Sequence, residues 1–120
     1  MSVSVVVPSK NRPREVARML ASLRAQATLP LETIVIDQST PRYALEPFDG
    51  LVHVHAPELG GLTAARNAGV ERARGDIVLF FDDDVVLKSD CVGAVARAFA
   101  ARPRNCQPAR PPRPSRSTKN

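Results

Sequence analysis

Apolar residues are grouped along the chain in four short runs, each as long as a β-strand. Residues 2–7 form a β-branched run that stops at Pro8, and residues 33–36 form a second run. Residues 51–55 alternate between apolar and polar positions, and residues 76–81 are again mostly apolar. Continuous apolar runs of this length are typical of strands that are buried on both faces, as in parallel sheets.

The stretches between these runs show helical spacing instead. Residues 13–27 carry apolar side chains three to four positions apart, and residues 62–73 lie between two glycines. A last helix is predicted over residues 92–101, opened by Ser89 or Asp90. Alternating strands and helices predict an α/β fold with a mainly parallel sheet and helices on both faces, because parallel neighbours need crossover connections.

Composition divides the chain into two unequal parts. The 120 residues include 17 basic and 12 acidic side chains, which gives a formal net charge of +5. Residues 102–120 hold six of those basic residues and no acidic one, and they lack Val, Leu, Ile, Met and Phe. We therefore expect a near-neutral folded unit over residues 1–101 and a disordered Pro/Arg-rich tail over residues 102–120. The tail is either a solvated basic appendage or the product of a shifted reading frame.

Several classes of protein are excluded by what the pattern lacks. No apolar run approaches the roughly 20 residues of a transmembrane helix, and no secretory signal precedes the first strand. A cytoplasmic protein is expected, with peripheral attachment at the inner membrane face left open. Because the positive charge is concentrated in the tail, nucleic acid is not an expected partner of the folded unit. Cys91 and Cys106 do not have the spacing of metal ligands.

Polar residues follow three of the predicted strands. Ser9 to Arg12 come after the first strand, Asp37 after the second, and Asp82, Asp83 and Asp84 after the fourth. The carboxyl ends of parallel strands form one edge, which is where open α/β sheets bind ligands. Three consecutive aspartates repel one another unless a cation or hydrogen-bond donors compensate, and Mg²⁺ or Mn²⁺ is the simplest cation. In extended backbone Asp82 and Asp84 would face together and Asp83 away. The alternative is a solvated acidic turn.

Three further residues are candidates at or near this edge. Arg66 lies on the predicted helix that precedes the fourth strand, where it could bind a diphosphate or be an ordinary solvated arginine. His53 and His55 share one face of the third strand, but no third metal ligand is evident, and we interpret them as a half-exposed strand surface. No phosphate-binding glycine-rich motif of the P-loop or GxGxxG type is present.

Four segments carry a resemblance to a known family, in the order SVVVPSKNRP, TIVIDQS, GLTAARNAG and GDIVLFFDDDV. Together they resemble the N-terminal half of family 2 glycosyltransferases, which are of the GT-A type and use nucleotide-diphosphate sugars. The resemblance covers about residues 3–101. It implies a Rossmann-like nucleotide-binding half that is truncated, because family members continue well beyond this length.

The resemblance also implies where a nucleotide-sugar would bind. Pro8 would flank the nucleobase, Asp37 would contact the nucleoside, and Arg66 would approach the base or the diphosphate. The second strand is followed by Gln38 where many members carry a second acidic residue, which puts part of the nucleoside contact in doubt.

The acidic run would complete the donor site by the same resemblance. Asp83 would be placed for the ribose and Asp84 for the metal, with Asp82 supporting both. The implied reaction is a metal-dependent, inverting transfer of a sugar to an unknown glycan, lipid or other hydroxyl acceptor. No residue is recognised as the catalytic base, so the chain alone is expected to be inactive. The alternatives are a non-catalytic nucleotide-binding module and a module that binds nucleic acid through its basic tail.

Overall fold

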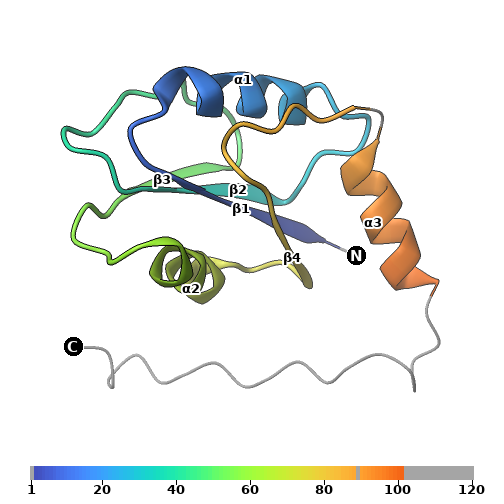
Figure 1. The fold of residues 1–120 in the computed structure, drawn as a ribbon. Helices are drawn as coiled ribbons and strands as arrows, with labels where there is room; N and C mark the ends of the chain where they lie inside the picture. Colours follow the sequence, from blue (N-terminus) through green and yellow to red (C-terminus); the bar gives the residue numbers. More distant parts are fainter. Residues whose placement is uncertain (1, 89, 102–120) are drawn as a thin grey trace.

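The computed structural model describes residues 2–88 and 90–101. The expected disorder of residues 102–120, the candidate cap Ser89 and Cys106 all lie outside the described residues. The elements occur in the predicted order: β1 (Val3–Ser9), α1 (Pro13–Arg24), β2 (Glu32–Asp37), β3 (Leu51–His55), α2 (Leu62–Arg72), β4 (Ile77–Phe80) and α3 (Cys91–Ala100). The four strands form one parallel sheet in the order β3-β2-β1-β4, which confirms the α/β prediction (Figure 1).

The central strand β1 has neighbours on both sides and helices over both faces. Val5, Val6 and Val7 are all fully buried, so consecutive residues face two different apolar environments. This position explains why the run is continuously apolar rather than alternating.

Strand β1 continues through Pro8 to Ser9, so the prediction that Pro8 stops it was wrong. The Val6 carbonyl accepts from Phe81 of the β4 side, whereas the Ser9 carbonyl accepts from Gln38 of the β2 side. Pro8 therefore points its backbone nitrogen to the β4 side, because backbone groups alternate sides along a strand. The register of β4 ends at Phe80, opposite Val6, so the missing N–H of Pro8 leaves no bond of the sheet unmade.

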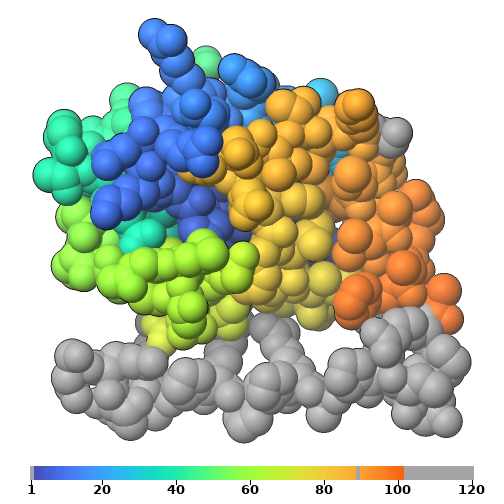
Figure 2. Space-filling model, viewed as in Figure 1, coloured from blue at the N-terminus to red at the C-terminus, as the bar shows by residue number. Residues whose placement is uncertain are grey.

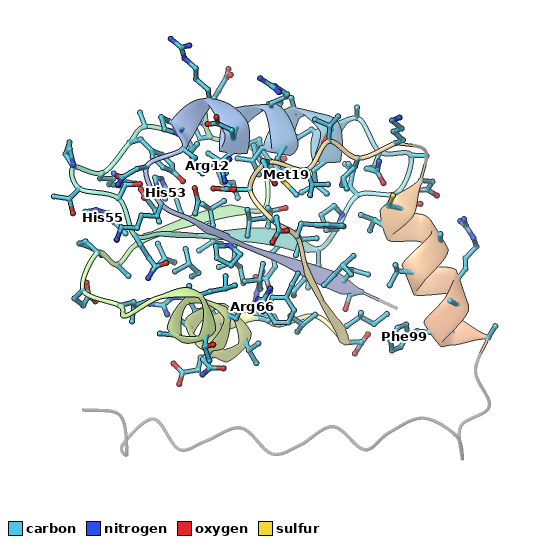
Figure 3. The ribbon with its side chains drawn as sticks, viewed as in Figure 1. Arg12, Met19, His53, His55, Arg66 and Phe99 are labelled. Carbon is cyan, nitrogen blue, oxygen red and sulfur yellow. The ribbon has the colours of Figure 1, made fainter. Side chains whose placement is uncertain are left out.

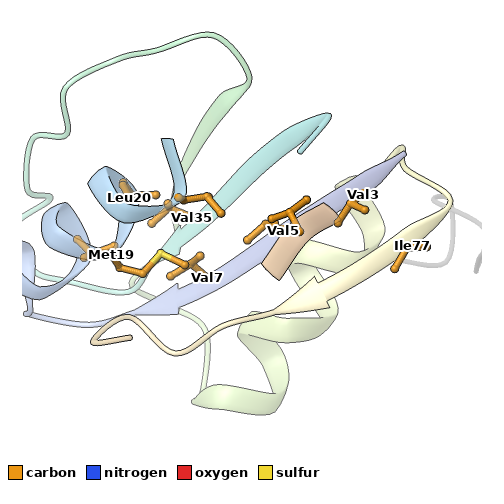
Figure 4. Close-up of a cluster of buried hydrophobic side chains, with 10 residues drawn as sticks. Val3, Val5, Val7, Met19, Leu20, Val35 and Ile77 are labelled. Atoms are coloured by element: carbon orange, nitrogen blue, oxygen red, sulfur yellow. The ribbon is translucent and has the colours of Figure 1, made fainter. Parts of the chain in front are cut away.

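Two apolar clusters lie on opposite faces of the sheet. The cluster on the α1 face combines residues of β1, α1 and α3, including Val5, Val7, Met19 and Val92, and Figure 4 shows Met19 over Val7. The cluster on the α2 face is smaller and is built from Val6, Ile34, Ile36, Ala65 and Ala73. Helices thus cover both faces, as predicted (Figure 1).

Helix α1 ends at Arg24 rather than at residue 27, where the apolar spacing had placed its end. The loop that follows is attached to the start of α3 instead. Asp90, the N-cap of α3, accepts hydrogen bonds from Thr28 N and Thr28 Oγ1 at 3.0 Å each and from the Gly93 amide at 3.2 Å. The prediction that Asp90 begins the last helix is confirmed. Residues 25–28 do not continue α1, and Thr28 instead contacts Asp90, 62 positions further along the chain.

The amino-terminal ends of the strands are joined by a buried carboxylate. Glu32 is 3% exposed and accepts 2.6 Å hydrogen bonds from Ser4 Oγ and the Arg74 amide. Burial acts to raise the pKa of Glu32, but the hydrogen bonds from Ser4 and Arg74 outweigh it, and the pKa is lowered. This network ties the connection between α2 and β4 to β1 and β2.

The segment after β4 returns across the α1 face of the molecule. In the space-filling view it lies directly against the beginning of α1 (Figure 2). The Leu87 amide donates to Ser22 Oγ at 3.0 Å, which fixes the segment along the helix. None of the helices in residues 2–88 and 90–101 has the length and apolar character needed to cross a membrane.

Candidate functional site: the carboxyl edge of the sheet

The strand order reverses between β1 and β4. From β1 the chain adds β2 and then β3 on one side, and it returns to place β4 on the other side. Open α/β sheets bind ligands outside the carboxyl ends of the strands at such a reversal. The loops that follow β1 and β4 are therefore the part of the molecule in which a ligand site is expected.

These two loops are joined by polar contacts. Ser9 Oγ donates to Asp83 Oδ2 at 3.1 Å. The Arg12 guanidinium lies 3.5 Å from Asp83 Oδ1 and 3.7 Å from Asp84 Oδ2. Arg12 reaches them because the chain turns at Asn11, which has φ 57° and donates its amide to Ser39 Oγ. The sequence had not selected Arg12 from its loop, and this cation supplies part of the compensation that the aspartate run needs.

Asp83 is the buried member of the aspartate run. It is 7% exposed, whereas Asp82 and Asp84 are exposed. The pKa of Asp83 is raised mainly by burial, which the Ser9 hydrogen bond and the Arg12 charge only partly offset. The run lies in a turn in which the Val85 amide approaches the Asp82 carbonyl at 3.4 Å, rather than in extended backbone. Asp83 differs from its two neighbours in burial, but its carboxylate and that of Asp84 contact the same Arg12 guanidinium.

The exposed carboxylates have the chemistry of a divalent-cation site. In the described part of the chain, no three His, Cys, Asp or Glu side chains are grouped closely enough to hold a metal ion. Mg²⁺ is usually held by one or two carboxylates together with substrate phosphates, so Asp82 and Asp84 fit a metal that is shared with a diphosphate. Without a diphosphate they supply too few ligands to hold a metal tightly.

Asp37 lies at the end of β2 and is fully buried. Its Oδ1 accepts the Ser39 amide at 2.9 Å, and its Oδ2 lies 2.8 Å from His53 Nε2. Burial acts to raise the pKa of Asp37, but the hydrogen bonds from His53 and Ser39 outweigh it, and the pKa is lowered. Asp37 is thus held as a carboxylate within the protein.

His53 was missed as part of this site, because the sequence left it on a half-exposed surface. His55 is exposed, but the side chain of His53 is only 9% exposed. The parallel register places His55 beside Asp37 and His53 beside Val35, all on one face. His53 lies two residues before His55, the residue that pairs with Asp37. This spacing could have indicated the contact between His53 and Asp37, but only if the register of β2 and β3 had been known.

Tyr43 packs on the other side of the His53 ring. The ring centroids are 5.6 Å apart and the planes are inclined by 23°. The buried hydroxyl makes no hydrogen bond of standard geometry, and it lies near Ser9, Asp37 and Asp83. Burial, with a further contribution from the two carboxylates, raises the pKa of Tyr43 to about 12.

Pro8 and Arg66 lie on the opposite face of the sheet from the carboxylates. Arg66 Cζ is 5.6 Å from the centre of the Phe80 ring, and its Nε is buried without a hydrogen-bond partner. Phe80 and Pro8 are in register with residues of the α2-face cluster, whereas Asp37 and Ser9 belong to the α1 face. Figure 3 shows Arg66 beside α2, and Arg12 and His53 at the carboxyl edge.

The chain is similar to known proteins of one enzyme family. Residues 4–120 match the profile of a family described as glycosyl transferase family 2. An uncharacterized glycosyltransferase of Bacillus subtilis, YwdF, is 33% identical over 88 residues, or 70% of this chain. An uncharacterized glycosyltransferase of Haemophilus influenzae is 38% identical over 85 residues, or 68% of this chain.

A solved structure agrees with the sequence relatives. The crystal structure of Staphylococcus aureus TarS superposes with a TM-score of 0.67 and 25% identity over 83% of this chain and 20% of that one. The alignments with the two curated relatives cover 33% and 29% of their lengths, so the chain spans about a third of each. Because the family profile extends over nearly all of its residues, the chain belongs to glycosyl transferase family 2 and carries the N-terminal half of the GT-A fold.

Proposed function

We propose that this chain is the donor-binding half of a metal-dependent, inverting glycosyltransferase that moves a sugar from a nucleotide diphosphate to a hydroxyl acceptor. The observation that carries the proposal is the joining of Ser9, Arg12 and Asp83 across the strand reversal between β1 and β4. This arrangement gathers carboxylates where an α/β sheet binds nucleotides. Membership of the family supports sugar transfer as the general chemistry.

The nucleoside end of the donor is assigned to the loops after β1, β2 and β4. Asp37 accepts from the nucleoside, and Asp83 accepts from a ribose hydroxyl beside Ser9. Pro8 flanks the base at the end of β1. Arg66 has an Nε without a partner, which supports a role in binding base or phosphate oxygens from the α2 side.

The diphosphate end is assigned to the exposed part of the aspartate run. Asp84 would hold Mg²⁺ or Mn²⁺ with support from Asp82, and the bound metal would neutralise the departing diphosphate. Arg12 lies against Asp84 at an exposed position, and its five N–H donors allow it to exchange that carboxylate for a phosphate oxygen. The acceptor hydroxyl needs a general base, and we assign none among the described residues.

Calorimetric titration with nucleotides tests the donor site directly. UDP, GDP, CDP, ADP and dTDP would each be titrated into the 120-residue chain with and without MnCl₂. We expect one nucleotide to bind in a metal-dependent manner and Asp84→Ala to weaken that binding by about tenfold or more. Asp49→Ala removes an exposed carboxylate before β3, at the other end of the sheet, and is the matched control.

Two outcomes would contradict the proposal. If none of the five nucleotides binds with metal, the chain is not a donor-binding half. If Asp84→Ala binds as tightly as the unchanged chain, the metal assignment is wrong.

A further inference from the structure

The side chains around Asp37 form a layered cluster that neither the motifs nor the family resemblance assign. Asp37 lies innermost and the His53 ring contacts it, with Tyr43 stacked on that ring. Arg42 reaches the remaining ring nitrogen from the surface, with its NH2 3.3 Å from His53 Nδ1. Figure 3 shows His53 at the carboxyl edge, on the same side of the sheet as Arg12.

The partners of His53 determine which ring nitrogen carries the proton. Arginine has only donors, so Nδ1 of His53 must accept from Arg42. A neutral ring that accepts at Nδ1 carries its proton on Nε2, which donates to Asp37 Oδ2 at 2.8 Å. Because the Ser39 amide holds Oδ1, both oxygens of Asp37 are oriented by the protein. The unused lone pairs of the carboxylate therefore have fixed directions.

Tyr43 restrains the His53 ring and lies near the carboxylate. Its ring stacks on the imidazole, and its buried hydroxyl lies beside Ser9 and near Asp37 and Asp83. Asp37 has no exposed surface, so a ligand reaches it only when a covering group moves. Tyr43 is the candidate for that movement, because it is only partly buried and stacks on the His53 ring that contacts the carboxylate.

The other end of β2 shows how the same strand holds a carboxylate without such a cluster. Glu32 is buried and is held by Ser4 Oγ, the Arg74 amide and the Arg74 guanidinium, and no histidine or stacked ring contacts it among the described residues. Buried ionic pairs are often no better for stability than apolar side chains of the same volume. At Asp37 the orienting side chain is instead a buried histidine that is itself held by Arg42 and Tyr43, and it lies at the edge where open α/β sheets bind ligands.

We propose that His53 is a positioning residue of the donor site, which holds Asp37 in the orientation that accepts a hydrogen bond from the nucleoside while Tyr43 moves aside. This inference rests on the proposed function and deepens it. His53 acts through Asp37 and does not itself contact the donor. The bond that His53 supplies can be replaced by an amide only if the amide nitrogen reaches the position of Nε2.

Paired amide variants test this geometry. His53→Gln places a side-chain N–H near the position of Nε2, whereas His53→Asn is shorter and does not reach Asp37. UDP, GDP, CDP, ADP and dTDP serve as probes in the presence of MnCl₂. We expect His53→Asn to lower the affinity for the nucleotide that binds by about tenfold or more. We expect His53→Gln to stay within about threefold of the unchanged chain. Glu32→Gln, at the far end of β2, is the control for loss of a buried ionic group and should bind normally.

Two spectroscopic measurements accompany the titrations. The ring nitrogen shifts of His53 should report protonated Nε2 and unprotonated Nδ1. Tyr43 is the only tyrosine in the chain, so a tyrosine-specific NMR label follows its movement when nucleotide binds. We expect its signal to shift with the unchanged chain and with His53→Gln.

The outcomes separate this inference from the proposed function. If the unchanged chain binds no nucleotide, both are wrong. If it binds and His53→Asn binds equally well, or His53 carries its proton on Nδ1, the role of His53 is wrong and the donor site stands. If His53→Gln and His53→Asn both lose binding equally while folded, the position of the N–H does not matter, and the inference is again wrong.

Discussion

The hydroxyl of Ser9 donates to the carboxylate of Asp83 across 3.1 Å, between residues that are 74 positions apart. Both groups are buried, and the bond joins the loop after β1 to the loop after β4. It therefore links the two loops on either side of the point where the strand order reverses. A donor site at this edge depends on that link, because it places the aspartate run against β1.

Removal of the Ser9 hydroxyl should destabilise the protein. Ser9→Ala leaves a buried carboxyl without its donor, which typically costs about 1 to 3 kcal/mol in the free energy of unfolding. Urea denaturation would measure the change. Ser2→Ala removes a hydroxyl that is bonded to Asp76 at an exposed position, and it should stay within about 0.5 kcal/mol of the unchanged chain. Equal effects of the two substitutions would show that the Ser9 bond does not stabilise the fold.

Arg12 contacts Asp84, so it should compete with a cation for that carboxylate. In the absence of nucleotide, Arg12→Ala should tighten the binding of Mn²⁺ alone by about two- to fivefold, the range expected for loss of an exposed ion pair. Electron paramagnetic resonance of free Mn²⁺ would measure it. Arg14→Ala removes an equal charge from the exposed side of α1 and is the control. Weaker Mn²⁺ binding by Arg12→Ala would contradict the predicted competition.

Tyr43 should titrate far above an ordinary tyrosine. Its pKa is raised from 10.0 to about 12, first by burial and then by the nearby carboxylates. Because the pKa of Tyr43 is higher in the folded than in the unfolded protein, the folded state is favoured while the hydroxyl is protonated. The contribution of Tyr43 to stability is therefore complete below pH 10 and is lost as the pH rises towards 12. Near-ultraviolet absorbance reads this single tyrosine directly. Asp83→Asn should lower the pKa of Tyr43. A titration midpoint of Tyr43 near pH 10 in the unchanged chain would contradict the buried position of its hydroxyl.

Glu32 should contribute to acid denaturation. Its native pKa is lowered, so the stability that it provides is complete above the ordinary glutamate pKa and is lost as the pH falls through the native value. Glu32→Gln should cost about 1 to 3 kcal/mol at neutral pH, because a buried hydrogen-bonded group is changed, and less as the medium becomes acidic. Urea midpoints across the acid range would measure the difference. A difference that does not change with pH would contradict the lowered pKa.

Gly69 lies where α2 packs tightly against Val6 of the sheet. A Cβ at this position would overlap both methyl groups of Val6, which is fully buried and has no room to move. Gly69→Ala should destabilise the chain by about 1 to 3 kcal/mol, although alanine is the better helix former. At Gly60 an added Cβ meets nothing within 4 Å, so Gly60→Ala should be nearly neutral in the same thermal unfolding experiment. Addition of Val6→Ala should restore part of the loss at Gly69.

Local patterns along the sequence were sufficient for the order and type of every element. Apolar runs of strand length and helical spacing are properties of neighbouring residues, and seven elements in the described residues follow them. The exceptions have tertiary causes. Pro8 is accommodated because β4 ends beside it, and the residues that follow the early end of α1 are held by Asp90 through Thr28. Neither cause can be read from neighbouring residues.

The candidate site was predictable in its acidic residues and not in their partners. Asp37 and the aspartate run were identifiable because they directly follow strands. Arg12 and His53 reach these carboxylates through contacts between residues that are distant in sequence, and such contacts depend on the register and the turn at Asn11. Arg66 was placed beside the same edge, and in the structure it lies over Phe80, the last residue of β4, on the α2 face.

Pro8 has a consequence for how the sheet ends. Continued pairing of β1 with β4 beyond Val6 would need the next hydrogen bond to run from residue 8 to the Phe81 carbonyl, and proline has no N–H to give. The pairing of the two strands therefore cannot be extended through this hydrogen bond. The covalent structure of Pro8 therefore sets where the pairing of β1 with β4 ends. A ligand that lies between the carboxyl ends of these strands would not have to break a sheet hydrogen bond.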